Sequence, residues 1–310
     1  MGVSNRPMVS IACITYNHER FIAQTVDSFL MQQTDFPVEI IIGEDCSKDS
    51  TRAILLKYRE QYPDRIKLLL PEQNLGPIQN VLATLGACTG KYIALCEGDD
   101  YWTDPHKLQR QYDLMEARPD LSFCYHRVAR YKDGVFSDYW PEKYEDRERT
   151  FPDVFQDWDI SVASVLFRKD KLPCRELLTS SKAGDQALCY GLAAQGNCYY
   201  MEACMSYYRH HAGGATNDNS ISWIQERTKT YMALAMYEGN RYRKEIEDKI
   251  EEMLSPRLNG LHALPSSLRK IKAYLGFFKE LMIDFNKLSL KKRIGIMSRL
   301  VLNRNKATRV

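Results

Sequence analysis

The chain has 310 residues, of which 44% are hydrophobic, 27% charged and 11% aromatic. This balance is typical of a globular protein and excludes a disordered or collagen-like chain. A chain of this length forms one large domain, or a domain of about 200 residues with an extension. It has no run of about 18 apolar residues, so we expect no membrane-spanning helix.

Nine cysteines are scattered through apolar stretches, and no two have the CxxC spacing of a zinc or redox site. We therefore interpret them as small buried hydrophobic residues in a reducing compartment. The first residues of the chain also lack the basic and then apolar layout of a secretory signal. Together these features predict a cytoplasmic protein.

The net charge of +3 is divided unevenly along the chain. Residues 268–310 carry 12 Lys and Arg but only two acids, a net charge of +10, which leaves −7 for residues 1–267. Apolar residues recur at helical spacing between these bases. Such basic amphipathic helices favour an anionic membrane surface as partner, or they pack as a cap on the rest of the protein. Nucleic acid is not favoured, because no recognised reading motif accompanies the bases.

Short apolar runs alternate with segments of helical spacing in the first 117 residues. Strands are predicted over 9–15, 38–45, 66–70 and 91–96. Helices are predicted over 21–31, from Asp49 and Ser50 to Pro63, over 77–88 and over 105–117. Strands that alternate with helices indicate βαβ units, so we expect an α/β fold with a mostly parallel sheet flanked by helices.

The pattern continues to about residue 211. Strands are predicted over 121–131, 161–168, 198–201 and 204–211, a helix over 185–196, and a polar aromatic loop over 132–150. From about Ser220 the sequence changes to amphipathic helix, and residues 216–220 have the composition of a linker. We therefore predict two domains, residues 1–216 and a basic helical extension over residues 217–310.

Polar residues follow three of the predicted strands: Thr15-Tyr16-Asn17, Glu44-Asp45 and Glu97-Gly98-Asp99-Asp100. In open α/β sheets, ligands bind beyond the carboxyl ends of the strands. Acids that gather at such an edge repel one another unless a positive group is present. The pattern therefore predicts a divalent cation with oxygen ligands, bound to a phosphate.

Two interpretations of these acids remain open. Asp45 can accept a hydrogen bond from a nucleobase or a ribose, with Tyr16 stacked on the base. Alternatively, Asp45 and Asp49 cap a helix, while Asp99 and Asp100 form a solvated turn. The sequence has neither a GxxxxGK[ST] loop nor a GxGxxG motif after the first strand, so side chains and the metal would have to hold the phosphates.

Six motifs in order resemble glycosyltransferase family 2, whose members have the GT-A fold. They are ITYN (14–17), EDCSKDST (44–51), NLG (74–76), CEGDDYWTDP (96–105), GDQAL (184–188) and YRHHAGG (208–214). The resemblance covers about residues 8–215, and no single motif is specific. It implies a Rossmann-like GT-A domain that uses a nucleotide-sugar donor, with Mg²⁺ or Mn²⁺, in an inverting transfer.

The resemblance implies a role for each residue at a family position. The residues that match donor-binding positions are Thr15, Tyr16, Asn17, Glu44, Asp45, Asn74, Glu97 and Asp99. The first two line the base pocket of the family, the third holds its turn, and Asp45 reads the base. Glu44 and Glu97 stand where Asp is usual, which puts their roles in doubt.

The same resemblance implies a metal site. Asp99 or Asp100 binds the cation and the other contacts the ribose, while His211 completes the metal shell. His210 is adjacent, and alternation along a strand turns it the other way, so that one of the two histidines is structural. Arg209 pairs either with a phosphate or with a surface acid.

Asp185 matches the catalytic base of the family, which takes a proton from the acceptor hydroxyl. Asp185 also suits the N-cap of the helix that follows it, and the two roles are compatible. Trp102, Trp140 and Trp158, with the tyrosines between 125 and 144, either stack on the acceptor sugar or belong to the core.

We therefore expect a transfer from a UDP-sugar to a glycan or lipid-linked glycan acceptor in bacterial surface polysaccharide synthesis. The enzyme would act in the cytoplasm or at the inner face of the cell membrane. One rival is a sugar-nucleotide nucleotidyltransferase, but TYNHERF (15–21) replaces its Gly-rich loop. The other rival is a non-catalytic nucleotide- or glycan-binding module, against which the intact acids at 45, 99, 100 and 185 argue.

Overall fold

The computed structural model describes residues 7–132, 134–142, 145–211, 221–237, 241–246 and 248–249. The chain divides into two units, Met1–Glu247 and Asp248–Val310. The basic segment 268–310, with its predicted membrane contact, lies outside the described residues. None of the described helices is both long and apolar enough to cross a lipid bilayer.

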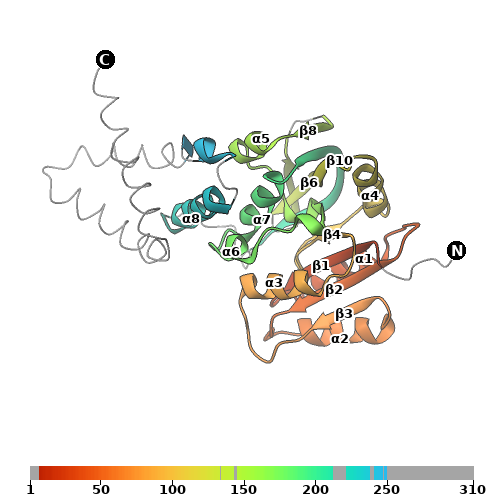
Figure 1. Ribbon diagram of the computed structural model, residues 1–310. Helices are drawn as coiled ribbons and strands as arrows, with labels where there is room; N and C mark the ends of the chain where they lie inside the picture. The colour runs from red at the N-terminus through yellow and green to blue at the C-terminus, as the bar shows by residue number, and fades with distance from the viewer. Residues whose placement is uncertain are drawn as a thin grey trace, which may run out of the picture. The chain divides into compact units, whose positions relative to one another are not determined.

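Four parallel strands and four helices alternate in the first half of the sheet (Figure 1). The strands are β1 (Val9–Thr15), β2 (Val38–Glu44), β3 (Ile66–Leu69) and β4 (Tyr92–Leu95). The helices are α1 (Ile22–Leu30), α2 (Thr51–Gln61), α3 (Pro77–Ala87) and α4 (Lys107–Ala117). Each element lies within two residues of its predicted range, so the predicted βαβ alternation is confirmed.

The rest of the sheet is mixed. Its strands are β5 (Tyr101–Trp102), β6 (Leu121–Lys132), β7 (Val135–Trp140), β8 (Arg147–Arg149), β9 (Leu166–Arg168) and β10 (Asn197–His210). The described strands form one ten-stranded sheet in the order β3-β2-β1-β4-β9-β6-β10-β5, with β7 paired to β6 and β8 to β10. Because β9 is antiparallel to both β4 and β6, the strands β1, β2, β3, β4, β6 and β10 run in one direction. Their carboxyl ends therefore meet at one edge.

In this second half the structure differs from the predicted elements in three places. Residues 132–150, predicted as a loop, contain β7 and β8. The prediction failed because the largely exposed side chains of β7 lack the alternation of a half-buried strand. Residues 161–168 begin with a 3₁₀ turn (Val162–Ser164), in which the Ser164 hydroxyl donates to the Ser161 carbonyl (2.6 Å). The two strands predicted over 198–211 are one strand, β10, whose pairing with β6 shifts register between Met201 and Cys204.

The core lies between the sheet and its helices. Ile22, Val26 and Phe29 of α1 are fully buried, and the Phe29 ring lies 4.9 Å from that of Trp102. Trp102 is 1% exposed, and its indole N–H donates to the Ala163 carbonyl (2.8 Å). Trp102 therefore belongs to the core, and the sugar-stacking interpretation is wrong for this residue.

All nine cysteines are free. The six buried ones, Cys13, Cys88, Cys96, Cys124, Cys189 and Cys198, confirm the interpretation as small core residues. Cys46 and Cys204 are half-buried and Cys174 is exposed, so that interpretation is wrong for these three. The reducing compartment stays a prediction.

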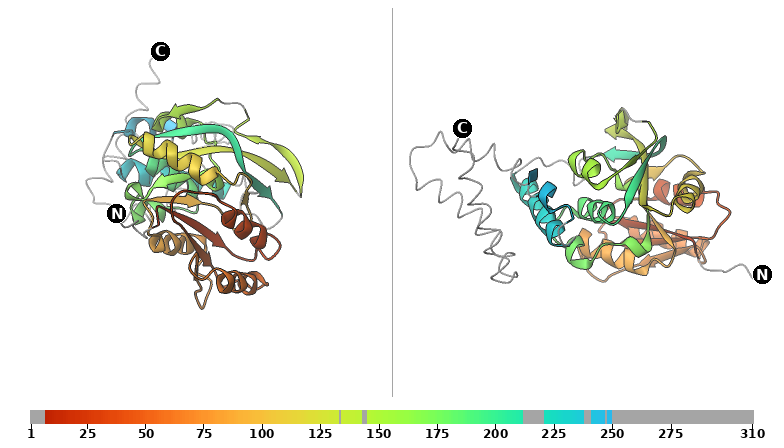
Figure 2. Two further views of the ribbon diagram at one scale, coloured as in Figure 1. Left: turned by 90° about the vertical axis from the view of Figure 1, so that its right-hand side faces the viewer. Right: turned by 45° about the horizontal axis from the view of Figure 1, so that its top comes forward.

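Four more helices are described: α5 (Phe151–Gln156), α6 (Arg175–Leu178), α7 (Gly184–Ala193) and α8 (Ile221–Tyr237). α8 packs against α6 and α7, and Figure 2 shows it beside α7. The hydroxyls of Ser181 and Thr230 share a hydrogen bond of 2.5 Å, which ties α8 to the segment before α7. The first unit thus includes α8, which follows residue 216, and the predicted domain boundary there stays a prediction.

Lys107, the first residue of α4, is fully buried and has no carboxylate partner among the described residues. Its Nζ donates to Gln111 Oε1 (2.7 Å) and lies 4.0 Å from the centre of the Trp102 ring. Desolvation lowers the pKa of Lys107 from its ordinary value of 10.5 to about 7, against the weaker opposing effect of Cys96 and Cys124. The folded protein is therefore less stable when this amine is protonated than when it is neutral.

We expect Lys107→Met to raise the free energy of unfolding near neutral pH. The unfolded lysine keeps its proton up to about pH 10.5, whereas the folded one releases it near pH 7. Since the unfolded chain binds more protons in this window, the stability contribution of Lys107 rises with pH, by up to about 1.4 kcal/mol per unit. The advantage of the variant should therefore shrink from about pH 7 to about pH 10 in urea unfolding.

Lys57→Met, on the exposed side of α2, is the matched control. It should keep the free energy of unfolding within about 0.5 kcal/mol of wild type at each pH. An advantage of Lys107→Met that stayed constant across the pH range would contradict a buried amine that titrates.

Candidate functional site

Two loops at the carboxyl edge of the sheet are joined by hydrogen bonds between side chains and backbone. In the loop after β1, Asn17 has a left-handed backbone with φ of 57°. Its side-chain oxygen accepts from the Lys48 N–H (2.8 Å), and its own N–H donates to the Ser47 hydroxyl (2.9 Å). The His18 N–H donates to the Thr51 hydroxyl (2.8 Å). These contacts fix the turn between β1 and α1.

Asp45 joins the loops after β1, β2 and β3. It is 2% exposed, and its Oδ1 accepts from the Leu75 N–H (2.7 Å). The Asn74 side chain donates to the Asp45 carbonyl (2.9 Å), and the Asp45 N–H donates to the Thr15 carbonyl (3.0 Å). Asp45 therefore does not cap α2, whose N-cap is Ser50.

Glu44, which precedes it, is fully buried. One carboxylate oxygen accepts from the Ser47 N–H (2.6 Å), and the other is paired with Arg52. Arg52 also donates to the Pro71 carbonyl (3.0 Å). Both oxygens of Glu44 are thus engaged in holding the loop after β2.

The turn Glu97-Gly98-Asp99-Asp100 follows β4 and packs closely on the end of β1. A Cβ atom on Gly98 would lie 2.4 Å from Thr15 Oγ1, so glycine is required for this approach. The Thr25 hydroxyl, on α1, lies 3.0 Å from the Gly98 carbonyl and 2.7 Å from the Asp100 carbonyl. This packing holds the three carboxylates of the turn at the sheet edge.

Arg209, near the end of β10, clamps the same turn. Its backbone N–H donates to Asp100 Oδ1 (2.8 Å), and its Nη1 donates to the Asp99 carbonyl (2.5 Å). Its guanidinium also bonds to Gln24 and lies 4.2 Å from the centre of the Tyr101 ring. The prediction that Arg209 pairs with a surface acid is therefore wrong, because the guanidinium is turned inward toward backbone and ring.

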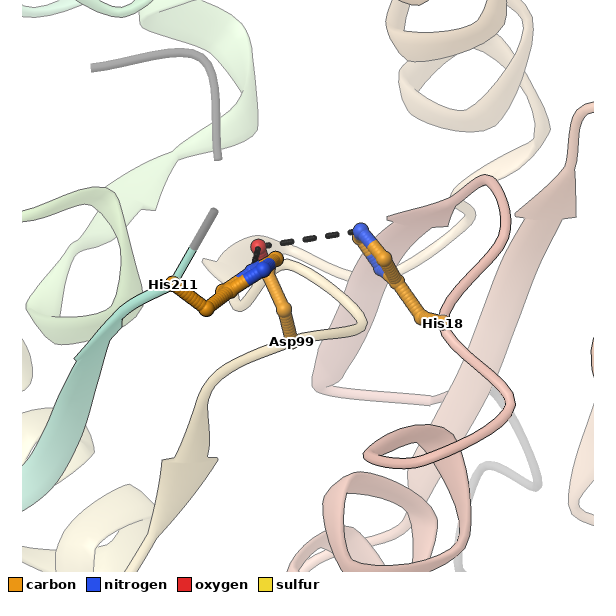
Figure 3. A group of neighbouring side chains, drawn as sticks. All are labelled: His18, Asp99 and His211. Carbon is orange, nitrogen blue, oxygen red and sulfur yellow. Dashed lines mark hydrogen bonds and ion pairs between the residues drawn. The ribbon is translucent and has the colours of Figure 1, made fainter. Parts of the chain in front are cut away.

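Asp99 lies between two histidines that come from different loops, as Figure 3 shows. Its Oδ2 is 3.0 Å from His211 Nε2 and 3.7 Å from His18 Nε2. His211, which follows β10, therefore lies beside Asp99, and its role as a metal ligand stays a prediction. Sequence analysis missed His18. The signal available in the sequence was its place just after the end of a strand. In the structure, its Nδ1 lies 3.2 Å from Thr15 Oγ1.

The carboxylates of Glu97, Asp99 and Asp100 offer oxygens that all lie within 4.8 Å of one another. Desolvation, followed by the charge of Asp99, raises the pKa of Glu97 to about 8 and that of Asp100 above its usual range. Desolvation acts on Asp99 in the same direction, but His211 and His18 outweigh it, and the pKa of Asp99 is lowered. Since Asp100 is 1% exposed, the interpretation of these acids as a solvated turn is wrong.

Two oxygens of this cluster, Asp99 Oδ1 and Asp100 Oδ2, are buried and have no hydrogen-bond partner in the described part of the chain. His18, Asp99 and His211 form a second group whose ligand atoms lie within 4.8 Å of one another. Carboxylate oxygens suit Mg²⁺ or Mn²⁺, and added imidazole nitrogens favour a transition metal such as Mn²⁺ over Mg²⁺. The residues therefore fit a divalent cation, and Asp99 is common to both groups.

Asp185 is the second residue of α7, whose N-cap is Ala183, so the interpretation of Asp185 as an N-cap is wrong. Its Oδ1 accepts from the Gln186 N–H (2.8 Å). Its side chain reaches solvent, yet desolvation by the surrounding protein raises the pKa of Asp185. Its charge also contributes to the raised pKa of Glu97, so the two carboxylates lie within electrostatic range of each other.

Comparison with protein families matches residues 10–174 to the family described as Glycosyl transferase family 2. The chain is 35% identical over 211 residues to the uncharacterized protein Rv1520 of Mycobacterium tuberculosis, covering 66% of this chain and 60% of that one. It is 29% identical over 206 residues to the putative teichuronic acid biosynthesis glycosyltransferase TuaG of Bacillus subtilis, covering 66% and 79%. The chain thus spans about 60% of the length of its mycobacterial relatives.

Two solved structures have a similar fold. S. aureus TarS (residues 1–349) in complex with UDP-GlcNAc has a TM-score of 0.62 at 17% identity, covering 87% of this chain and 79% of that one. The mannosyltransferase PcManGT of Pyrobaculum calidifontis, in complex with GDP-Man and Mn²⁺, has a TM-score of 0.54 at 16% identity, covering 90% and 81%. At these identities the likeness concerns the fold alone, and it confirms the predicted GT-A fold.

We expect Mn²⁺ to bind at Asp99. Asp99→Asn removes a charged ligand shared by both groups, and His211→Ala removes the imidazole closest to it, so each should weaken Mn²⁺ binding at least about tenfold. Free Mn²⁺ measured by electron paramagnetic resonance during a protein titration gives the dissociation constants.

His210→Ala is the matched control, because His210 lies on the other face of β10, with its ring 4.9 Å from that of Tyr208. It should leave the Mn²⁺ dissociation constant unchanged. Equal effects of the two histidine substitutions would reject the site as described.

Proposed function

The chain belongs to glycosyltransferase family 2, and on this basis we propose that it is an inverting, metal-dependent enzyme that transfers a sugar from a nucleotide sugar to an acceptor hydroxyl. One observation carries the proposal. The acids form two separate sites, a cluster at Glu97, Asp99 and Asp100 with two unpartnered oxygens, and the solvent-accessible carboxylate of Asp185. The transfer needs one site that neutralises the charged leaving group and a second site that takes the proton of the acceptor hydroxyl.

The donor nucleoside lies, in this proposal, over the ends of β1 and β2. Tyr16 is half-buried at this edge, so part of its ring remains available to a base. Thr15 and Asp45 are buried beside it and linked through their backbones (3.0 Å). Glu44 and Asn74 hold the surrounding loops through the contacts described above, and they act as positioning residues.

Asp99 and His211 would hold Mg²⁺ or Mn²⁺, with His18, Glu97 and Asp100 at the same site. When bound, the cation neutralises the charge that develops on the leaving diphosphate. Arg209 keeps its guanidinium on the Asp99 carbonyl and its N–H on Asp100, so it orients both acids without giving up its own contacts. These contacts of Arg209 would hold the turn in the same geometry whether or not the cation is bound.

Asp185 is the proposed general base. Its carboxylate reaches solvent and points to no cationic partner within hydrogen-bonding distance in the described residues, so it is free to accept the proton of the acceptor hydroxyl. A raised pKa makes this carboxylate a better proton acceptor near neutral pH. Attack by the hydroxyl on the face opposite the leaving group inverts the anomeric centre.

We further propose a UDP-sugar as donor, because TarS, with the same fold, is crystallised with UDP and with UDP-GlcNAc. The glycan or lipid-linked glycan acceptor, and a role in bacterial surface polysaccharide, are favoured by the similarity to TuaG, which is named for teichuronic acid biosynthesis. A cytoplasmic enzyme whose basic segment 268–310 binds the anionic inner face of the membrane would suit a lipid-linked acceptor.

Asp185→Asn tests the base. We expect the rate of UDP release from the donor in the presence of acceptor to fall by about 10²–10⁴-fold, because the amide cannot take the proton. Donor affinity, measured by isothermal titration calorimetry, should not change. Asp170→Asn, on an exposed turn, is the control and should keep full activity. Full transfer by the Asp185 variant would remove the base assignment.

UDP, GDP, dTDP and CMP, each with and without Mn²⁺, identify the donor class. We expect UDP with Mn²⁺ to stabilise the protein most, by about 2.7 kcal/mol at 100 times the dissociation constant. Tyr16→Ala should weaken that binding about tenfold through lost stacking. Tyr62→Ala, exposed at the end of α2, should not. Stabilisation by all four nucleotides without metal would count against a metal–nucleotide site.

A further inference from the structure

A second cavity, of about 630 Å³, lies outside the acid cluster. It is lined by residues from three segments: Trp140 to Glu142 at the end of β7, Gln156 to Asp159 at the end of α5, and Arg227 on α8. The side chains that matter are two aromatic rings, a buried carboxylate and a guanidinium. All of them belong to the first unit.

Both tryptophans of the cavity are half-buried and held by contacts on one side. The Trp158 ring packs edge-on against Tyr190 of α7, with centroids 5.2 Å apart. The Arg130 guanidinium lies over Trp140, 5.6 Å from its ring centre, and is itself fixed by an ion pair with Asp138. Fixed rings with a free side can stack on a flat apolar surface such as a sugar ring.

Two polar groups of the cavity have an atom without a hydrogen-bond partner among the described residues. Asp159 is 7% exposed, and its Oδ1 is paired with Arg149 while its Oδ2 is buried without a partner. Arg227 donates from Nη2 to the Tyr231 hydroxyl (3.2 Å), while its Nε is buried without a partner. One unpaired acceptor and one unpaired donor are costly in a folded protein, and a ligand hydroxyl can satisfy each of them.

The charge of the lining restricts the ligand. Asp159 is already paired with Arg149, so Glu142 and Asp157 bring two further carboxylates against the cation of Arg227. A diphosphate, a phosphodiester or a uronate would meet repulsion here, whereas uncharged hydroxyls can donate to carboxylates. The cavity therefore suits a neutral, hydroxyl-rich ring.

The cavity is also in contact with the helix that carries the proposed base. Trp158 contacts Tyr190, which lies on the same helix as Asp185. The charge of Arg227 acts on both, opposing the rise in the pKa of Asp185 that desolvation causes and the rise in the pKa of Tyr190. A ligand that contacts Arg227 is thus within the electrostatic surroundings of Asp185.

We propose that this cavity binds one uncharged pyranose unit of the acceptor, stacked on Trp140 or Trp158, with hydroxyls bonded to Asp159 and Arg227. The inference rests on the proposed function, because it assigns the sugar to the acceptor and not to the donor. It also divides the tryptophans by role: Trp102 is core, while Trp140 and Trp158 recognise substrate.

Saturation-transfer NMR with methyl glycosides tests the site. The probes are the methyl glycosides of glucose, galactose, N-acetylglucosamine and glucuronic acid, each added to protein saturated with UDP and Mn²⁺ so that the donor site is occupied. We expect at least one uncharged glycoside to bind and the glucuronide to bind more weakly. At least one of Trp140→Ala and Trp158→Ala should raise the dissociation constant about tenfold.

Two further variants keep the test sharp. Trp158→Phe preserves a ring against Tyr190 and should retain more binding than Trp158→Ala, which guards against loss of folding. Tyr139→Ala alters the neighbouring residue of β7, which lines a different cavity with Arg127, and should not change glycoside binding.

Three results would overturn the inference: no binding of any uncharged glycoside, unchanged binding in both tryptophan variants, or preference for the glucuronide. Stabilisation by UDP and Mn²⁺ reports separately on the proposed function. Nucleotide binding without glycoside binding would reject only this cavity. Glycoside binding that depends on the tryptophans in a protein with no UDP release would support a saccharide site and reject the transferase.

Discussion

The carboxylates of Glu97, Asp99 and Asp100 share one tight turn, and the fold must hold them together against their mutual repulsion. The Thr25 hydroxyl lies within hydrogen-bonding distance of two carbonyls of that turn, and Arg209 bonds to the turn through both its backbone and its side chain. These contacts supply donors and one fixed cation but leave two carboxylate oxygens unpartnered within the described chain. The remaining negative charge makes this edge suited to a cation.

Sheet topology explains how a residue 110 positions away reaches this turn. β10 is antiparallel to β5, with Ser206 opposite Trp102 and Tyr207 opposite Tyr101. When that register is continued, Arg209 lies opposite Asp99. This position agrees with the hydrogen bond from the Arg209 guanidinium to the Asp99 carbonyl. The short β5 strand, which buries the Trp102 ring, thus aligns the end of β10 with the acids, and His211 follows from the same alignment.

The sequence predicts the parts of this site whose signal is local. Apolar runs and helical spacing are read within about ten residues, and they locate the strand ends that carry Asp45 and Asp99. The clamp by Arg209 depends on strand pairing across the whole domain, which no local pattern encodes. His18 was missed for the same reason, since its partner Asp99 is remote in the sequence. β7 lacks buried alternation, but Asp133-Gly134 stands between β6 and β7 in the sequence and is a two-residue hairpin signal that sequence analysis missed.

Carboxylates of one chain can take opposite chemical roles because their surroundings differ. Two histidines flank Asp99 and lower its pKa, which keeps it ionised and suited to a cation. Asp185 has no such flanking pair, and desolvation raises its pKa while its oxygens stay accessible to solvent. Arg227 opposes that rise without forming an ion pair with Asp185. By placing Arg227 beside α7, α8 contributes a charge that favours the ionised form of the proposed base.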